Sequence, residues 1–455
     1  MPSEHSRPDG VAELCCLGGH VAFYGGVYDA VRGAALGGDV NLFTVIGILL
    51  TLAAALSYLN FRFLRLPPTI GLMLQSLLLS LALIGLYAAV VPLVAPVRVF
   101  LDSINFNEVL MHGMLSFLLF AGALEINLDD LLSVKLEVGL FATLGVAGSL
   151  VIVGLLLHVI LDALGLPLPL MACLLFGALI SPTDPVAVLS MLEHMRAPKD
   201  LENQIAGEAL FNDGFGVVAF VVLLHVAGGR AAGTGEAMVL LAREAGGGLA
   251  FGLLLGWAGY LILKSVDDYP VEILITLAMV AGGYALAWEL EISGPLAMVM
   301  AGLFIGNRGR RIAMSDKTRQ NLDRFWELID VFLNAVLFVL IGLEVLAISD
   351  TLTGSHLLAG AVAVPVVLVA RLVSIGVPQT ALRTFRKYPP RALAILTWAG
   401  LRGGIPVALA LSLPHGHARD VLLSVTYVVV AFSILVQGTT VRPLIALAER
   451  KASDL

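Results

Sequence analysis

Residues 176–188 read Phe-Gly-Ala-Leu-Ile-Ser-Pro-Thr-Asp-Pro-Val-Ala-Val. Two prolines, Pro182 and Pro185, flank Asp184 in a stretch that is otherwise mostly apolar. Pro185 lacks a backbone N–H donor and disfavours helical geometry at the residue before it, so a helix through this stretch is interrupted at Asp184. The interruption leaves carbonyl groups near Pro182 and Thr183 free. An apolar helix that breaks around a carboxylate is the feature from which we predict the fold.

The surrounding chain is far too apolar for a soluble protein. It has 455 residues, of which 58% are hydrophobic and 13% charged, and a mean hydropathy of +0.94, whereas soluble domains have about a quarter charged residues. A spanning helix needs about 20 apolar residues, so the chain holds about a dozen spans and no large soluble domain. We therefore expect membrane lipids and no nucleic acid as partners. Long continuous apolar runs also exclude a transmembrane β-barrel.

The hydropathy pattern predicts thirteen apolar segments, and residues 1–39 before them are mixed in character and have no assigned role. We predict a transmembrane domain over 40–447 and a short cytoplasmic tail over 448–455. The predicted segments are 40–60, 66–92, 106–124, 136–161, 168–192, 203–227, 238–263, 271–288, 293–306, 325–348, 356–377, 392–413 and 420–441.

The distribution of lysine and arginine agrees with this number of segments. With the loop after the first segment in the cytoplasm, 19 of the 27 lysines and arginines lie inside and four lie in outside loops. Cytoplasmic loops carry such an excess of positive charge. We predict an external N-terminus and a cytoplasmic C-terminus, in the plasma (inner) membrane. Six of the positive charges lie between Arg308 and Arg324, on a predicted cytoplasmic loop.

A second interruption lies 219 residues after the first. Residues 400–406 read Gly-Leu-Arg-Gly-Gly-Ile-Pro, and the same offset relates Glu125 to Glu344 at two segment ends and Asp184 to Gly403. Repeats at about 40–227 and 271–441, with a linker helix at 238–263 between them, would start on opposite sides of the membrane. Interrupted helices in matching positions of two inverted repeats indicate a transporter binding site near the bilayer midplane.

We place five charged residues near the bilayer centre, where each costs about 2.5 to 3.5 kcal/mol on insertion scales. They are Asp184, Glu208, Asp213, Arg371 and Arg402. The alternative to a functional site is a buried lattice of ion pairs that holds helices together. Three acids against two arginines leave a surplus of one negative charge, which one proton or one monovalent cation neutralises.

The spacing of the acids favours a cation site. Glu208 and Asn212 share a helix face, whereas Asp213 points about a quarter turn away. Free carbonyls, the Thr183 hydroxyl and the carboxylates of Asp184 and Asp213 are hard oxygen ligands for a small cation. A proton and a cation that compete for one site already constitute an exchange mechanism.

These motifs resemble those of the monovalent cation:proton antiporter-1 family, the NhaP-type sodium/proton exchangers. The resemblance runs from about Val40 to Leu447 and rests on three motifs in order, namely residues 176–188, 208–214 (Glu-Ala-Leu-Phe-Asn-Asp-Gly) and 400–404 (Gly-Leu-Arg-Gly-Gly). It implies an all-α fold of about 13 transmembrane helices, with two inverted six-helix repeats whose broken helices cross at the midplane, as in NhaA-like antiporters. It also implies a homodimer.

The resemblance also implies residue roles. Asp213 is the main cation and proton site, with Na⁺ held at Asp213, Asp184 and Thr183. Asn212 in place of a second aspartate accompanies electroneutral exchange. Glu208 pairs with Arg371, and Arg402 holds the crossing together with the prolines Pro182 and Pro185. Two departures from the family pattern, Ala209 in place of serine and Ala121 in place of an acid, leave fewer oxygen ligands and affect ion preference.

We therefore predict a secondary antiporter that exchanges Na⁺, and also Li⁺, for H⁺ one for one in pH and sodium homeostasis. We expect no enzyme activity and no cofactor beyond the transported ions. Three alternatives remain: a K⁺/H⁺ antiporter of the same family, an intramembrane aspartyl hydrolase that uses Asp184 and Asp213 as paired acids, and a passive cation channel. The prolines, the two arginines and the neutral Asn212 argue against the hydrolase.

Overall fold

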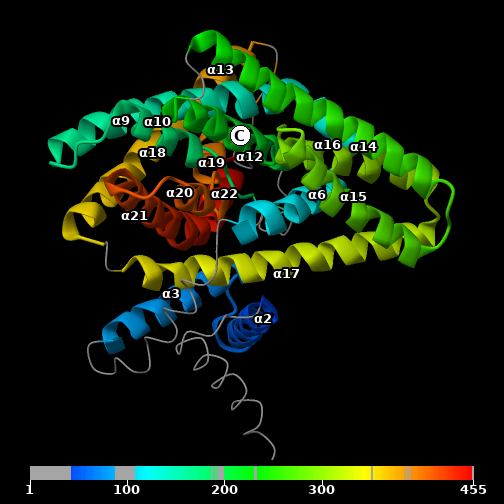
Figure 1. The fold of residues 1–455 in the computed structure, drawn as a ribbon, viewed down its shortest axis with the longest axis horizontal. Helices are drawn as coiled ribbons and strands as arrows, with labels where there is room; N and C mark the ends of the chain where they lie inside the picture. The colour runs from blue at the N-terminus through cyan, green and yellow to red at the C-terminus, as the bar shows by residue number, and fades with distance from the viewer. Residues whose placement is uncertain are drawn as a thin grey trace, which may run out of the picture.

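The computed structural model describes residues 42–87, 108–185, 188–189, 192, 199–229, 233–349, 352–384, 386, 388 and 391–452. The predicted N-terminal segment 1–39 lies outside these residues, as does the end of the second apolar segment beyond residue 87. Every regular element in the described part of the chain is helical (Figure 1). Nine of the described helices are long and apolar enough to cross a membrane, and two shorter apolar helices, Val109–Glu125 and Leu170–Leu179, accompany them.

One set of helices, which we call the panel, includes the long helix α17. In Figure 1, α17 runs along the length of the molecule with α3 beside it, and α3 is its most extensive partner. Ser80 joins the two helices by donating a hydrogen bond to the Gly342 carbonyl at 2.7 Å. The panel helices are α2 (Leu42–Leu59), α3 (Pro68–Tyr87), α6 (Leu115–Glu125), α13 (Thr234–Leu241), α14 (Gly247–Leu263), α15 (Tyr269–Glu289), α16 (Gly294–Phe304) and α17 (Asp316–Ile348).

The second set, which we call the core, contains both interrupted helices. In Figure 1 it occupies the side of the molecule where α9, α10, α18, α20 and α21 are labelled. Within it, α10 packs mainly against α9 and α12, and α18 packs against α9 and α21. The core helices are α7 (Leu128–Ser133), α8 (Lys135–Leu140), α9 (Val146–Ala163), α10 (Leu170–Leu179), α12 (Lys199–Ala227), α18 (Gly354–Leu382), α19 (Ala392–Trp398), α20 (Ile405–Leu411), α21 (His417–Phe432) and α22 (Gly438–Ala452).

Short π-helical segments interrupt or extend several spans. A π-segment inserts an extra residue into a helix and often marks a functional site. The π-segments are η1 (Asn60–Leu64), η2 (Val109–Met114), η3 (Phe141–Gly145), η4 (Ala242–Gly246), η5 (Ile305–Ala313) and η6 (Ser433–Gln437).

Large apolar side chains cover the outside of the bundle, as lipid contact requires. Phe61 is 82% exposed, and Leu254 and Trp257 of α14 are 62% and 53% exposed. The opposite face of α14 carries small residues instead: a Cβ atom at Gly252 would lie 2.3 Å from the Ala297 carbonyl oxygen of α16. Small residues that allow backbones to approach closely are typical of helix interfaces in membranes.

Two faces of the bundle are used as reference below. At the near face, α6 ends and both α12 and α17 begin. Asn307, after α16, donates to the Ile126 carbonyl at 3.0 Å just beyond the end of α6. Leu131, which follows in α7, packs at Gly207 near the start of α12. At the far face, α12 and α17 end.

The predicted interruptions are present. Helix α10 ends at Leu179 and the chain from Ser181 to Pro185 is non-helical, while α19 ends at Trp398 and α20 begins at Ile405. Beyond Pro185, the described residues 188, 189 and 192 are helical again. The all-helical fold class with two broken helices is thus confirmed.

The prediction that residues 308–324 form a loop was wrong. Segment η5 continues to Ala313, and α17 begins at Asp316. Ser315 caps α17, because its side chain accepts a hydrogen bond from the Thr318 backbone N–H at 3.4 Å, and Asp316 pairs with Arg319 one turn later at 2.9 Å. Local caps and ion pairs extend helices past the apolar stretch, which hydropathy alone does not register. For the same reason α22 continues through Ala452, into the predicted tail.

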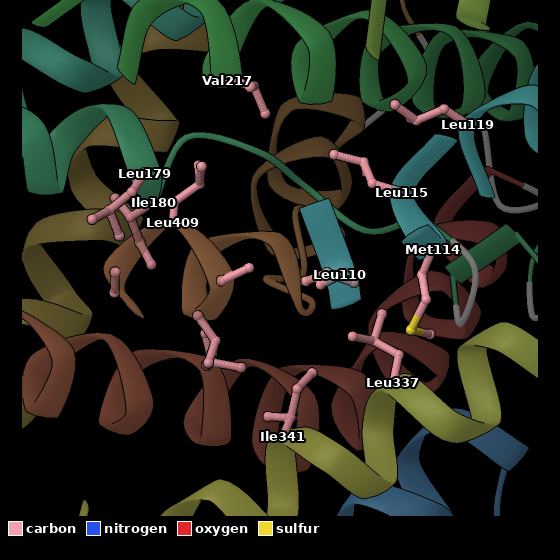
Figure 2. Close-up of a cluster of buried hydrophobic side chains, with 14 of the residues drawn as sticks. Leu110, Met114, Leu115, Leu119, Leu179, Ile180, Val217, Leu337, Ile341 and Leu409 are labelled. Atoms are coloured by element: carbon pink, nitrogen blue, oxygen red, sulfur yellow. The ribbon is translucent and has the colours of Figure 1, made fainter. Parts of the chain in front are cut away.

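Panel and core meet through a buried apolar cluster. Figure 2 shows Leu115 and Leu119 of α6 and Leu337 and Ile341 of α17 on the panel side of this contact. The core contributes Leu179 and Ile180 at the end of α10, Val217 of α12 and Leu409 of α20. Val217 follows the motif of α12 by one turn and Leu409 follows the second interruption, so the cluster lies on the far-face side of both breaks.

Candidate functional site

The two interrupted helices cross and form an antiparallel bridge. The Asp184 backbone N–H donates to the Leu401 carbonyl at 2.8 Å. Gly403 lies against the Asp184 carboxylate, because a Cβ atom added at Gly403 would be 2.5 Å from Asp184 Oδ2. Only glycine permits so close an approach. The repeat offset that relates Asp184 to Gly403 in the sequence therefore relates two residues that are in contact.

Arg402 holds the crossing from within. Its side chain is 2% exposed, and its Nη1 donates to the Ser181 carbonyl at 2.9 Å and to the Pro182 carbonyl at 3.0 Å. These are carbonyls that the break after α10 leaves without helical partners. A guanidinium also suits the negative end of the α10 dipole. Arg402 thus satisfies free acceptors and compensates charge at the same place.

Asn212 connects α12 to the first interruption. It is 1% exposed, and its Nδ2 donates to the Ser181 carbonyl at 3.1 Å, to Thr183 Oγ1 at 3.2 Å and to Glu208 Oε1 at 3.2 Å. The Asn212 amide therefore holds the non-helical segment 181–185 against α12 without adding charge.

Glu208 and Arg371 form a buried two-point ion pair between α12 and α18. Arg371 Nη1 donates to Oε1 at 2.5 Å and Nη2 donates to Oε2 at 2.6 Å, and the two side chains are 1% and 8% exposed for Glu208 and Arg371 respectively. Gly400 makes room for the arginine, since a Cβ there would lie 2.6 Å from Arg371 Nε. A planar guanidinium that binds both carboxylate oxygens gives the strongest form of such a pair.

Asp213 points to the crossing and remains half-buried. Its carboxylate accepts a hydrogen bond from the Thr183 backbone N–H, and the charged groups that act on it are Asp184, Glu208 and Arg402. Asp184 is also half-buried, whereas Thr183 is 3% exposed. The structure thus brings Asp213, Asp184 and Thr183 together at the crossing.

Two of these residues, Thr183 and Asp184, line a small pocket on the α12 side of the crossing. Thr183, Asp184, Pro185, Glu208 and Ala209 all contribute to it. The Ala209 methyl group occupies the wall where a serine would present a hydroxyl. Pro182 packs elsewhere, against Gly216 of α12, where a Cβ would lie 2.7 Å from its Cγ.

Sequence reasoning missed Asp330 of α17. It is a half-buried acid inside a span, hydrogen-bonded to Asn334, and Glu125 and Asp184 act on it electrostatically. The signal was available, because Asp330 and Asn334 are four residues apart in an apolar segment and share a helix face. The count of three acids and two arginines near the bilayer centre therefore omitted Asp330 of the panel.

Two supporting residues on η6 were missed as well. Ser433 Oγ accepts from the Arg402 backbone N–H at 2.8 Å, and Gln437 Nε2 donates to the Trp398 carbonyl at 3.2 Å. Each satisfies a backbone group beside the second interruption. The sequence carries no clear signal for them, because a serine and a glutamine in a span are ordinary and the π-segment that positions them leaves no pattern.

No group of three or more His, Cys, Asp or Glu side chains within the described ranges is arranged as a resident metal site. The oxygens at the crossing are two carboxylates, a threonine hydroxyl and carbonyl groups. Such ligands suit a hard cation that is bound reversibly.

Comparison with known proteins shows which family the chain resembles. Residues 48–447 match the family model described as sodium/hydrogen exchanger, transmembrane. The Na⁺/H⁺ antiporter NhaP of Pseudomonas aeruginosa is 46% identical over 407 residues, which cover 88% of this chain and 96% of that protein. The Na⁺/H⁺ antiporter NhaH of Halobacillus dabanensis is 33% identical over 88% of this chain and 96% of its own length.

The fold has a solved counterpart. The sodium proton antiporter MjNhaP1 of Methanocaldococcus jannaschii superposes with a TM-score of 0.71 at 21% identity, covering 89% of this chain and 98% of that one. The antiporter fold that the family resemblance implied is therefore present. The interrupted helices, their crossing and the family match agree, and the chain belongs to the transmembrane sodium/hydrogen exchanger family.

Proposed function

We propose that the protein exchanges Na⁺ for H⁺ at the crossing, with Asp213 and Asp184 as the carboxylates that bind either ion and Thr183 as an additional oxygen ligand. The observation that carries the proposal is the hydrogen bond from the Thr183 backbone N–H to the Asp213 carboxylate, which joins α12 to the first interruption. Family membership makes the chain a secondary transporter rather than an enzyme, and the named relatives are Na⁺/H⁺ antiporters.

Competition between the ions accounts for the exchange. Asp184, Glu208 and Asp213 face two arginines, Arg371 and Arg402, so this group of five side chains carries one surplus negative charge when its acids are ionised. Glu208 is already satisfied by Arg371. One proton or one Na⁺ at Asp213 and Asp184 restores neutrality, so the loaded core crosses the membrane interior at a lower cost than the empty one. This supports electroneutral one-for-one exchange.

Alternating access requires the core to move against the panel. Their contact on the far-face side is apolar (Figure 2), and an apolar contact has no directional bonds to break when it slides. Asn212 and Glu208 tie α12 to the crossing and to α18 by hydrogen bonds, so these core elements move together. The ion is carried with the core from one face to the other.

The finer assignments also belong to this proposal. The near face is the cytoplasmic face and the N-terminus is external, because the positive charges of η5 and early α17 lie at the near face. We propose the inner membrane, a homodimer and a role in pH and sodium homeostasis. Li⁺ follows Na⁺ as a substrate because both are small hard cations, and lipids are the remaining partners.

The test is exchange in proteoliposomes that contain an internal pH dye. Addition of Na⁺ or Li⁺ is expected to change the internal pH with the membrane potential clamped at zero, and K⁺ is expected to give a much smaller signal. Asp213→Asn is expected to abolish the response. A response to K⁺ alone would assign the chain to K⁺/H⁺ exchange, and a full response in Asp213→Asn would remove the proposed site.

A further inference from the structure

Asp330 is a carboxylate of the panel that faces the ion site in the core. It precedes Leu337 by seven residues, which is about two helical turns or roughly 10 Å along α17. Residues two turns apart lie on the same face, and Leu337 packs against Gly404 at the second interruption. Asp330 is therefore on the α17 face that meets the crossing, displaced toward the near face.

Its orientation is fixed by a neighbour on its own helix. Asn334, one turn later, is 8% exposed and hydrogen-bonds to the Asp330 carboxylate. An interaction four residues apart restricts the side chain to that helix face. The carboxylate is thus held in place while part of it remains exposed.

The charged groups that act on Asp330 are acids on two other elements. They are Glu125 at the end of α6 and Asp184 at the crossing. Asp330 thus lies between the near-face end of the panel and the ion site. A cation near Asp330 is attracted toward Asp184 as well.

Exposure differs between the two sides of the crossing. Asp330 and Asp184 are half-buried although they lie within spans. On the far-face side the apolar cluster of Figure 2 contains side chains of both core and panel, and Ile341, four residues beyond Leu337, is fully buried there. This packing favours approach to Asp330 and Asp184 from the near face, which the experiment below tests.

We propose that Asp330 is a positioning residue for the transported cation, which attracts Na⁺ from the near face and holds it beside Asp184 before it enters the site. The proposal rests on the proposed role of Asp184 and Asp213. It assigns a role in ion loading to the panel, whose helices carry none of the residues proposed to bind the ion. Asp330 acts on the core only when the ion site is open to the near face. Its effect on Na⁺ binding is therefore expected at that face alone.

The experiment compares Asp330→Asn with wild type in proteoliposomes and in vesicles that expose either face. Removal of one nearby negative charge is expected to raise the KM for Na⁺ about threefold to tenfold at one face, with kcat within about twofold of wild type. The KM at the opposite face stays unchanged. Added choline chloride is expected to reduce the difference between variant and wild type, because salt screens the attraction.

The controls separate charge from structure. Glu327→Gln removes an exposed acid about one turn before Asp330 on the same helix and is expected to leave the KM unchanged. Asp330→Glu retains the charge and is expected to keep the KM near the wild-type value, which also covers the case in which Asp330→Asn folds poorly. Thermal melting in detergent shows whether each variant is folded.

The outcomes distinguish this inference from the proposed function. An unchanged KM in folded Asp330→Asn, or a KM raised equally at both faces, would overturn the role of Asp330. If Asp213→Asn is inactive in the same preparation, the ion site stands and only the inference about Asp330 fails. If Asp213→Asn retains full exchange, the proposed site itself fails.

Discussion

Gly403 and Asp184 are 219 residues apart in the sequence, and the Gly403 backbone lies directly against the Asp184 carboxylate. The contact joins equivalent positions of the two predicted repeats. It brings a residue without a side chain against a charged side chain, because both helices are interrupted where they cross. The geometry of the proposed ion site therefore depends on a residue that has no side-chain functional group.

Gly403→Ala is expected to reduce exchange by more than about tenfold. A new methyl group would lie 2.5 Å from Asp184 Oδ2 and 2.9 Å from Asp184 Cβ, so the carboxylate must move. Na⁺-dependent pH change in proteoliposomes measures the loss. Gly282→Ala on α15 is the matched control, since no atom lies within 4 Å of the added methyl there. Equal activity of the two variants would show that the close approach is unimportant.

Thr183→Val is expected to raise the KM for Na⁺ while kcat changes little. Valine has nearly the same shape but no hydroxyl, so the cation loses one oxygen and Asn212 Nδ2 loses its 3.2 Å acceptor. The backbone N–H that binds Asp213 is retained. Steady-state kinetics over a range of Na⁺ concentrations gives both constants. Thr183→Ser should restore the KM, and failure to do so would mean that the hydroxyl is not a ligand.

Removing one partner of the Glu208 and Arg371 pair is expected to lower the stability of the protein more than replacing both partners by neutral residues. Removing one partner leaves an uncompensated charge in a buried place and costs about 3 to 5 kcal/mol. Glu208→Gln and Arg371→Met should each lower the melting temperature of the detergent-solubilised protein. The double variant should melt above both single variants. A double variant that melts below both would contradict this interpretation of the pair.

Ser433→Ala is expected to destabilise the second interruption. The Arg402 backbone N–H would lose its 2.8 Å acceptor in a buried place, which costs about 1 to 3 kcal/mol. Melting temperature and exchange rate both report the effect. Ser412→Ala provides the comparison, because Ser412 Oγ only donates to the Leu409 carbonyl within its own helix. Similar losses in both would argue against a special role for η6.

Proton competition predicts the pH dependence of sodium affinity. If one proton and one Na⁺ compete for the same carboxylates, the fraction of sites free to bind Na⁺ falls as pH falls. The KM for Na⁺ then rises by up to about tenfold per pH unit once the protonated form dominates, and it becomes constant at high pH. Kinetics at several pH values tests this directly. A KM that does not change with pH would mean that the two ions use separate sites.

Much of the fold could be predicted from the sequence because membrane insertion imposes strong constraints. Apolar length indicated an all-helical chain with many spans, and the prolines around Asp184 and the glycines around Arg402 marked the interruptions. The boundaries failed where polar chemistry extends a helix, as at Ser315 and Asp316. Asp330 was overlooked although its spacing to Asn334 was visible in the sequence, whereas its relation to Asp184 depends on the packing of other helices.

The amino-acid sequence by itself determined that the chain crosses a membrane, that two helices break, and which charged residues lie within the spans, because these properties follow from local composition and backbone restrictions. Only the tertiary structure decided how these residues meet: that Asp184 bridges to Leu401, that Arg402 binds the carbonyls of Ser181 and Pro182, and that Asp330 faces the site from the panel. Such contacts join residues more than a hundred positions apart. Their partners are selected by packing and by the need to satisfy buried charges and carbonyls, which no local pattern encodes.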